Sequence, residues 1–307
     1  MRGRMPRYQD GRLDNAFCSS WSRRGLVAGA GALALAGCKP GLRSPASAGP
    51  GAAASASTLA AAVAGDWRAP QDKARDVWRH PVESLTFWGV KPGATVIEFW
   101  PGAGWYSDIL APFLAATGGT LYAADVEPVT PAAGRMVEAY RRKLAARPAL
   151  YGQVRITAFG PNSTAVAPAG TADVALFLRN LHDWMAGGIA EKAFRDAYLA
   201  LKPGGVLGIE QHRAPPGGPQ DVLAANGYVQ VAYVKQMARE AGFDFDKESE
   251  INANPRDDHN HPFGVWTLPP TRLSAPRGQP PNPGFDHSRY DAIGESDRMT
   301  LRFIKEV

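Results

Sequence analysis

The stretch Val96-Ile97-Glu98-Phe99-Trp100-Pro101-Gly102-Ala103-Gly104 decides the fold. Its first half is a short apolar run with β-branched residues, which is typical of a buried strand, and its second half is a glycine turn. Residues 106–116, which follow, have the spacing of an amphipathic helix. A glycine turn between a strand and a helix lets the backbone approach a ligand closely and presents free N–H groups at the start of the helix.

The alternation of strands and helices continues along the chain. We predict five strands, at 95–100, 120–126, 153–159, 172–178 and 206–211, and two closing strands at 243–251 and 298–304. Helices are predicted at 106–116, within 138–146, and at 189–201 and 227–241, and one or two short helices are predicted between 69 and 88. This order predicts a single α/β domain with a mostly parallel seven-stranded sheet and helices on both faces.

Two further features belong to this pattern. A carboxylate is expected at the tip of the second strand, where it can accept hydrogen bonds from a ribose hydroxyl pair, and Asp125 occupies that place. The turn Lys202-Pro203-Gly204-Gly205 is predicted to separate a helix from the fifth strand. A glycine turn alone is weak evidence for a nucleotide-binding site. The glycine turn, Asp125 and the later turn at 202–205, in this order, are more specific together.

Glu98 to Gly104, then Asp125, then Leu201-Lys202-Pro203-Gly204-Gly205-Val206-Leu207 resemble the motif series of class I S-adenosylmethionine-dependent methyltransferases, which share a Rossmann-like fold. The wording FWPGAGWYSDILAP and the later NPRDDH look most similar to a group of bacterial predicted methyltransferases. The resemblance covers roughly residues 90–243. It implies S-adenosylmethionine as cofactor, with Glu98 supporting the methionine end, Gly102 and Gly104 facing the nucleoside, and Asp125 binding the ribose.

The chain departs from this family at Trp100, where most of the superfamily has glycine. A large indole at this position either clamps the cofactor, blocks it, or caps the sheet as a core aromatic residue. Tyr106, at the start of the next helix, either lines the methionine pocket or packs in the core.

Polar residues follow the fourth and fifth strands. The segments LRN and LHDW within residues 178–184 resemble the corresponding segment of small-molecule methyltransferases, which places Asn180 at the cofactor. His182 is a candidate general base, and Asp183 orients it or binds substrate. In the alternative interpretation, His182 and Asn180 hydrogen-bond the loop and Asp183 caps a helix. His212 is a second candidate base or a surface histidine.

The long segment 252–296 is rich in Pro, Gly, Asp and His, and we interpret it as a functional loop or lid, or as a disordered loop. It contains Asp257-Asp258-His259-Asn260-His261, whose carboxylates and imidazoles are possible metal ligands. Because adjacent residues of an extended loop seldom all point inward, we predict no metal site there.

The N-terminus is typical of an export signal. Arg23-Arg24 resembles the twin-arginine signal, and the apolar run Leu26 to Gly37 is too short to span a bilayer. Leu35-Ala36-Gly37-Cys38 resembles the bacterial lipobox, which implies a periplasmic protein anchored to the membrane through a lipidated Cys38. An ordinary secretory leader, or a cytoplasmic protein translated from Met5 or later, are the alternatives. We therefore predict an export signal at 1–38, a flexible Ala/Gly/Ser/Pro tether at 39–65 and a methyltransferase-type domain at 66–307.

Charge and cysteine content limit the partners of this protein. Residues 1–37 hold six arginines and two aspartates, so the rest of the chain has 28 basic and 27 acidic residues and is nearly neutral. That balance gives no support to nucleic-acid binding. The sequence therefore predicts a methyltransferase acting on an unidentified, small-molecule acceptor; the alternative is an exported ligand-binding or non-methylating protein on the same scaffold. The oligomeric state is not readable from the sequence.

Overall fold

The structure is a computed structural model, and it describes residues 56–306. The predicted export signal, the lipobox-like Cys38 and the first part of the predicted tether lie outside the described residues. Within residues 56–306, no helix is both long enough and apolar enough to cross a membrane.

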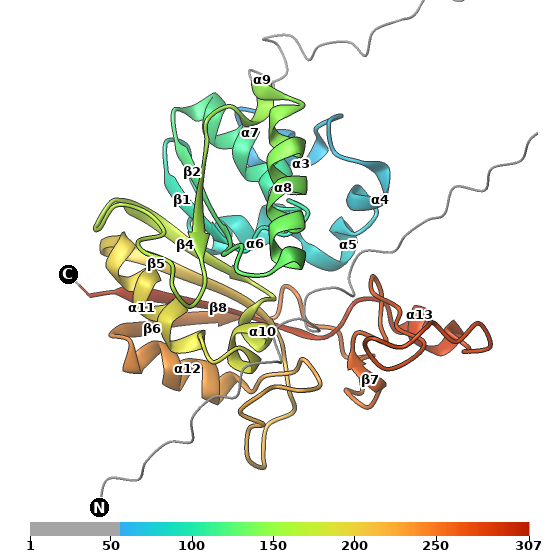
Figure 1. The fold of residues 1–307 in the computed structure, drawn as a ribbon. Helices are drawn as coiled ribbons and strands as arrows, with labels where there is room; N and C mark the ends of the chain where they lie inside the picture. The colour runs from blue at the N-terminus through green and yellow to red at the C-terminus, as the bar shows by residue number, and fades with distance from the viewer. Residues whose placement is uncertain (1–55, 307) are drawn as a thin grey trace, which may run out of the picture.

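Seven strands form one sheet in the order β3-β2-β1-β4-β5-β8-β6 (Figure 1). The first five strands are parallel, and β8 is antiparallel to both of its neighbours. The strand bounds are β1 Thr95–Phe99, β2 Thr120–Val126, β3 Val154–Phe159, β4 Ala172–Leu178, β5 Leu201–His212, β6 Phe243–Ser249 and β8 Arg298–Lys305. The predicted α/β fold with a mostly parallel seven-stranded sheet is confirmed.

Helices cover both faces of the sheet, because side chains alternate between the faces along each buried strand. Ile97 and Phe99 of β1 belong to a core with α10 (Leu181–Ala186), α11 (Ala190–Ala200) and α12 (Val231–Glu240). Val96 belongs to a second core on the other face. The helices of that face are α3 (Leu59–Ala64), α6 (Pro81–Phe87), α7 (Ser107–Thr117), α8 (Pro131–Ala145) and α9 (Pro148–Tyr151).

Strand β1 lies at the centre of the sheet, between β2 and β4. From β1 the chain builds β2 and β3 on one side, and it then returns to build β4 and β5 on the other. The strand order therefore reverses between β1 and β4, and in open parallel sheets this reversal opens a crevice at the carboxyl ends of the strands.

Residues 202–205 do not separate a helix from the fifth strand, as predicted, but lie inside β5. Ala172 pairs with Leu201, and Val174 then pairs with Val206, so the residues between bulge out of the β4–β5 ladder. Gly204 has a positive φ of 74°, which glycine adopts without steric cost. The sequence signalled a turn, and the sheet accommodates it as a bulge.

The folded region begins before the predicted start at residue 66. Helix α3 lies inside the range predicted as tether, and the Thr58 hydroxyl caps it by accepting from the Ala61 N–H at 3.1 Å. Ala62 is fully buried, and α3 contacts α7. Small alanine side chains allow this close approach and favour the helix, so the tether prediction is wrong for these residues.

Several short elements precede β1 or interrupt the long segment 252–296. Helices α4 (Pro70–Lys73) and α5 (Asp76–Arg79) come before α6, which begins at Pro81. Between β6 and β8, the chain forms β7 (Pro262–Val265) and α13 (Ser288–Ile293), which stand out at the right of Figure 1. The Asn254 side chain, which is buried, holds this segment by donating to the carbonyls of Ile293 and Glu295. The segment is therefore folded, and the alternative of a disordered loop is wrong.

Candidate active site

A cavity of about 560 Å³ lies at the carboxyl ends of β1, β2, β4 and β5, where the strand order reverses. Side chains from α5 and from the segment 265–296 form its outer wall. Nine of the ten site residues predicted from the sequence line the cavity, and Gly104 lies beside it in the glycine turn. The nine are Glu98, Trp100, Gly102, Tyr106, Asp125, Asn180, His182, Asp183 and His212.

The glycine turn is fixed in place by α8. Gly102 and Gly104 have positive φ angles of 59° and 80°. A Cβ on Gly104 would lie 3.0 Å from the Lys143 Nζ, which donates to the Ala103 carbonyl at 2.7 Å and pairs with the Asp108 carboxylate at 2.8 Å. At Gly102, no heavy atom lies within 4 Å of a Cβ position, so the turn leaves open space on its cavity side.

Asp125 presents an unpartnered oxygen at the cavity wall. Its side chain is buried, and its Oδ1 accepts from the Val126 N–H at 2.8 Å. Its Oδ2 is buried and has no hydrogen-bond partner among the described residues. Burial raises the pKa of this carboxyl to about 6. Because buried acceptors are nearly always satisfied, an orphaned oxygen on a cavity wall is suited to a ligand hydroxyl.

Glu98 lies near the end of β1, and Ser107, at the start of α7, holds its side chain. Its Oε2 accepts from the Ser107 hydroxyl at 2.6 Å, and Ser107 in turn hydrogen-bonds the Tyr140 hydroxyl at 2.9 Å. Burial raises the pKa of Glu98 to about 7, although the Ser107 hydrogen bond and Lys143 act in the opposite direction. This carboxyl therefore changes its charge near neutral pH.

We expect Glu98→Gln to stabilise the unliganded protein at pH 8 and to have little effect at pH 5. The folded-state pKa is raised, so the folded protein holds a proton that the unfolded chain releases above the ordinary pKa of 4.5. The stability linked to this proton is present below that value and is lost as the pH rises through about 7. The pKa rises from 4.5 to about 7, and a tenfold change in a protonation equilibrium is about 1.4 kcal/mol, so the gain at pH 8 is roughly 3 kcal/mol. Urea unfolding at both pH values measures it, and equal effects at both would contradict the assignment.

Trp100 is both packed in the core and exposed to the cavity. Its backbone has a φ of 46°, the left-handed conformation that glycine favours and other residues adopt at a cost. The indole N–H donates to the Phe159 carbonyl at 2.9 Å, and the ring packs edge-on against Trp184. Trp100 also lines a second cavity, beside residues that follow β2 and β3, so this residue borders both cavities.

Tyr106 and Asn180 make contacts inside the protein. The Tyr106 hydroxyl donates to Glu210 Oε2 at 3.0 Å, and its ring packs against Trp105. The Asn180 Nδ2 donates to the carbonyls of Phe99 and Trp100 at 3.0 and 3.2 Å. Asn180 thereby ties the end of β4 to the start of the glycine turn, which is consistent with the interpretation that its side chain organises the loop.

His182 is buried between two polar partners. Its Nδ1 lies 3.1 Å from Gln211 Nε2, and its Nε2 lies 3.4 Å from Asp183 Oδ2. Asp183 occupies the first turn of α10, whereas Asn180 is the N-cap residue. The alternative in which Asp183 caps the helix is therefore wrong, and Asp183 is placed to orient His182.

His212 lies beside His182 on the cavity wall. The two imidazole rings are 5.3 Å apart, and His212 Nδ1 lies 2.6 Å from the Ser296 hydroxyl oxygen. Burial lowers the pKa of His212 well below its usual value of 6.5, and His182, Arg298 and Arg179 add to this effect. A neutral imidazole in a cavity can accept a proton, and this placement differs from that of a surface histidine.

The sequence did not identify several charged residues of the cavity. Arg179 is part of the LRN segment after β4, and that segment was a usable signal. Arg75, Arg79 and Glu295 carry no local motif, because they meet only through pairing between residues about 220 positions apart. The cavity also contains Trp266 and Arg277 from the long segment.

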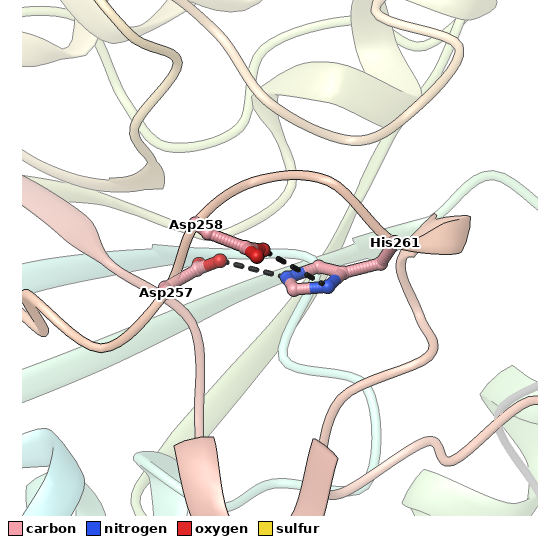
Figure 2. A group of neighbouring side chains, drawn as sticks. All are labelled: Asp257, Asp258 and His261. Atoms are coloured by element: carbon pink, nitrogen blue, oxygen red, sulfur yellow. Dashed lines mark hydrogen bonds and ion pairs between the residues drawn. The ribbon is translucent and has the colours of Figure 1, made fainter. Parts of the chain in front are cut away.

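The three side chains of Asp257, Asp258 and His261 converge, contrary to the expectation that neighbours in this loop point apart (Figure 2). Asp257 Oδ1 lies 2.8 Å from His261 Nε2, and Asp258 Oδ1 lies 3.6 Å from His261 Nδ1. Their candidate ligand atoms all lie within 4.8 Å of one another.

These carboxylates are already engaged within the protein. Asp257 accepts from the Tyr228 hydroxyl at 2.9 Å and from the N–H groups of His259 and Asp297 at 2.9 and 2.8 Å, in addition to His261. A carboxylate has about four lone-pair sites, so those of Asp257 are occupied. Asp258 pairs with Arg289. The cluster therefore closes the segment 257–261 against residue 297, next to the cavity.

The chain has no match among family models and none among curated proteins. Similar solved structures include a SAM dependent methyltransferase from Aquifex aeolicus, with 21% identity, 58% of this chain and 87% of that chain covered, and a TM-score of 0.47. The [4+2]-cyclase SpnF is 17% identical over 81% of this chain and 92% of its own, with a TM-score of 0.50. An O-methyltransferase from neocarzinostatin biosynthesis, in complex with S-adenosyl-L-homocysteine and 1,4-dihydroxy-2-naphthoic acid, is 14% identical over 77% of this chain and 56% of its own, with a TM-score of 0.45. At 17% identity the likeness to SpnF concerns the fold alone, an α/β fold built on a mostly parallel seven-stranded sheet.

Proposed function

We propose that this protein is an S-adenosylmethionine-dependent methyltransferase that acts on a small-molecule acceptor. The observation that carries the proposal is the buried, unpartnered Oδ2 of Asp125, on the cavity wall beyond β2. A carboxylate at the tip of the second strand is where nucleotide-binding sheets of this kind hold a ribose hydroxyl pair. The likeness in fold supports the proposal without determining the reaction.

The residues on the β1 and β2 side of the cavity fit such a cofactor. Asp125 would accept from the ribose hydroxyls, and the open side of Gly102 would admit the nucleoside against the backbone. Glu98, buried at the end of β1, would support the methionine end. When bound, S-adenosylmethionine supplies an electrophilic methyl group on a sulfonium centre.

The residues on the β4 and β5 side of the cavity fit the acceptor. For a hydroxyl nucleophile, a neutral imidazole must remove the proton, and His212 and His182 are the two candidates. Methyl transfer otherwise requires mainly alignment, which the buried and hydrogen-bonded surroundings of His182 favour. Asp183, 3.4 Å from His182, would orient that ring or bind the acceptor.

The proposal is tested by calorimetric titration of the purified full chain with S-adenosylmethionine and with S-adenosylhomocysteine. Binding of both ligands with similar affinity supports a working donor site. A folded sample that binds neither would overturn the proposal and would identify the indole of Trp100 as the first residue to replace.

We expect the affinity for S-adenosylhomocysteine to fall about tenfold as the pH is lowered from 7.5 to 5. Hydroxyl donors favour the ionised form of Asp125, whose pKa is about 6 in the free protein, so the ligand must displace a proton at lower pH. Calorimetry in buffers of different ionisation enthalpy measures the proton released on binding. Glu98 also titrates in this range, so Asp125→Asn is the matched variant, and its pH dependence should be weaker. An affinity that is constant across the range would contradict the assigned role of Asp125.

A second candidate function is an exported ligand-binding or non-methylating protein on this scaffold. Trp100 favours it, because a tryptophan that borders both cavities stands where the family has glycine. An exported location also favours it, because S-adenosylmethionine is not expected to be supplied there. Transfer of a labelled methyl group to any acceptor in a small-molecule screen would exclude this candidate, whereas ligand binding without transfer would support it.

The location itself is a proposal drawn from the sequence. We propose that the protein is exported and is anchored to the membrane through lipid on Cys38. Labelling cells with a fatty-acid analogue tests it, with Cys38→Ser as the control. A soluble, unprocessed protein would instead support the cytoplasmic alternative and would remove the difficulty of cofactor supply.

A further inference from the structure

The cavity has a cationic end, formed by α5, the ends of β4 and β5, and the start of β8. Four guanidinium groups meet two carboxylates there, and we call these six residues the arginine cluster. The members are Arg75, Arg79, Arg179, Arg298, Glu210 and Glu295, and all except Glu210 and Arg298 line the cavity.

Each carboxylate of the arginine cluster is shared among several cations. Glu295 accepts from the Nε atoms of Arg75 and Arg79 at 2.7 and 3.0 Å and from Arg298 Nη1 at 3.0 Å. Glu210 lies 3.0 Å from Arg179 Nη1 and 2.9 Å from Arg298 Nη1. Two carboxylates face four guanidinium groups, so the cluster keeps a surplus of positive charge at the edge of the cavity. Buried charge of one sign is costly unless a partner compensates it.

Two of these arginines have donors left for a ligand. Arg79 is only 4% exposed, and its hydrogen bonds to side chains use Nε alone, so its Nη atoms have no partner among the described residues. Its guanidinium carbon lies 4.7 Å from the centroid of the Trp105 ring, so the aromatic ring supports the fork from one side. Arg179 gives only Nη1 to Glu210, and its backbone has a φ of 65°. A planar fork held on an aromatic ring matches the geometry of a carboxylate or a phosphate.

The arginine cluster lies at the end of the cavity that holds the candidate bases. Glu210 is two residues before His212 in β5, and Glu295 precedes Ser296, whose hydroxyl oxygen is 2.6 Å from the His212 Nδ1. Arg298 pairs with Glu210, which also pairs with Arg179. Arg298 is the first residue of β8 and lies opposite His212 in the β5–β8 ladder. The carboxyls assigned to the cofactor, Glu98 and Asp125, stand on β1 and β2 instead.

We infer that the arginine cluster receives an anionic group of the methyl acceptor, so that the acceptor is a small molecule carrying a carboxylate or a phosphate. This inference rests on the proposed methyltransferase function. A carboxylate is also present at the methionine end of the cofactor, and the experiment must separate these two sources of the same chemistry.

The test is calorimetric titration of the full chain with inorganic phosphate and, separately, with benzoate, each with and without saturating S-adenosylhomocysteine. We expect at least one anion to bind, and to bind with unchanged affinity when S-adenosylhomocysteine is present. Competition between the anion and S-adenosylhomocysteine would assign the cluster to the cofactor carboxylate and would overturn the inference. Absence of binding by both anions to folded protein would overturn it as well.

Variants test whether the bound anion lies at the arginine cluster. Arg179→Gln should weaken anion binding about tenfold or more, and Arg179→Lys should restore only part of it, because lysine keeps the charge but lacks the planar fork. Arg75→Gln, at a more exposed position, gives a second reading if the first variant does not fold. Arg142→Gln removes an exposed arginine outside the cavity and should change nothing. Equal anion affinity in all variants would contradict the assigned site.

Failure of the inference is distinguishable from failure of the proposed function. If S-adenosylhomocysteine binds and neither anion does, the methyltransferase proposal stands and the acceptor is not anionic. If an anion binds and S-adenosylhomocysteine does not, the proposed function falls, and with it the assignment of the anion to a methyl acceptor.

Discussion

Replacing Asp125 with alanine should weaken the binding of S-adenosylhomocysteine on the order of a hundredfold. A ribose hydroxyl pair would donate to a buried carboxylate, and hydrogen bonds to charged groups contribute about 1.5–3 kcal/mol each. Oδ2 has no partner inside the described part of the chain, so the ligand meets an acceptor that no protein donor occupies. Calorimetry on the variant and the parent protein measures the difference, and thermal unfolding checks that the variant is folded.

A matched control is Asp173, which lies at the amino-terminal end of β4, on the side of the sheet away from the cavity. Asp173 follows the first residue of β4, where it accepts from the Thr95 N–H at 2.7 Å and pairs with Lys202. Asp173→Ala removes a carboxylate of the same type far from the carboxyl ends of the strands, and it should leave the affinity within about twofold of the parent, as is usual for sites without shared partners. Unchanged affinity in Asp125→Ala would remove the central claim of the proposed function.

The central strands β1, β2 and β4 were predictable because each one is a short, bounded and mostly apolar run. The predicted bounds of β2 and β4 match the structure, and those of β1 and β3 differ by one residue. Continuous apolar runs of this length are characteristic of parallel strands that are buried on both faces. The pattern therefore indicated the class of the sheet, and the order of its strands became known from the structure.

The wrong predictions of local structure lie where tertiary contacts override a local sequence signal. The turn at 202–205 is a bulge because β4 continues to pair on both sides of it. Helix α3 looked like a tether because alanines carry little apolar surface, yet packing against α7 is enough to bury Ala62. Local composition cannot distinguish such a helix from a flexible linker.

In the candidate site, too, the residues with a local sequence signal were predicted and those brought together by tertiary contacts were not. Residues at the carboxyl ends of strands, such as Asp125 and His212, were predictable, because these ends meet at one side of a parallel sheet. The arginine cluster was not predictable, because its members come from α5, β4, β5 and β8 and share no spacing. The acidic loop at 257–261 was misjudged for a related reason, since its side chains converge on Tyr228 and Asp297 from other parts of the chain.

Replacing Arg298 with methionine should lower the stability of the fold more than the other substitutions, because Arg298 connects segments that are far apart in the sequence. Arg298 is 1% exposed and contacts Glu210, Glu295 and the Trp78 carbonyl, so it connects β8 with β5 and α5. Removing one partner from a buried ionic network is costly, and here it takes away the guanidinium that bridges Glu210 and Glu295 and leaves their oxygens with fewer donors, which costs about 3–5 kcal/mol. For a domain of this size, we expect the thermal midpoint to fall by about 10 °C.

Arg302→Met is the matched control, because Arg302 lies four residues further along β8 and pairs with Asp246 near the surface. Partly exposed pairs contribute little, so the expected loss is below about 1 kcal/mol. A loss in Arg298→Met no larger than in Arg302→Met would mean that the remaining arginines compensate both carboxylates, and that Arg298 does not hold the cationic end of the cavity together.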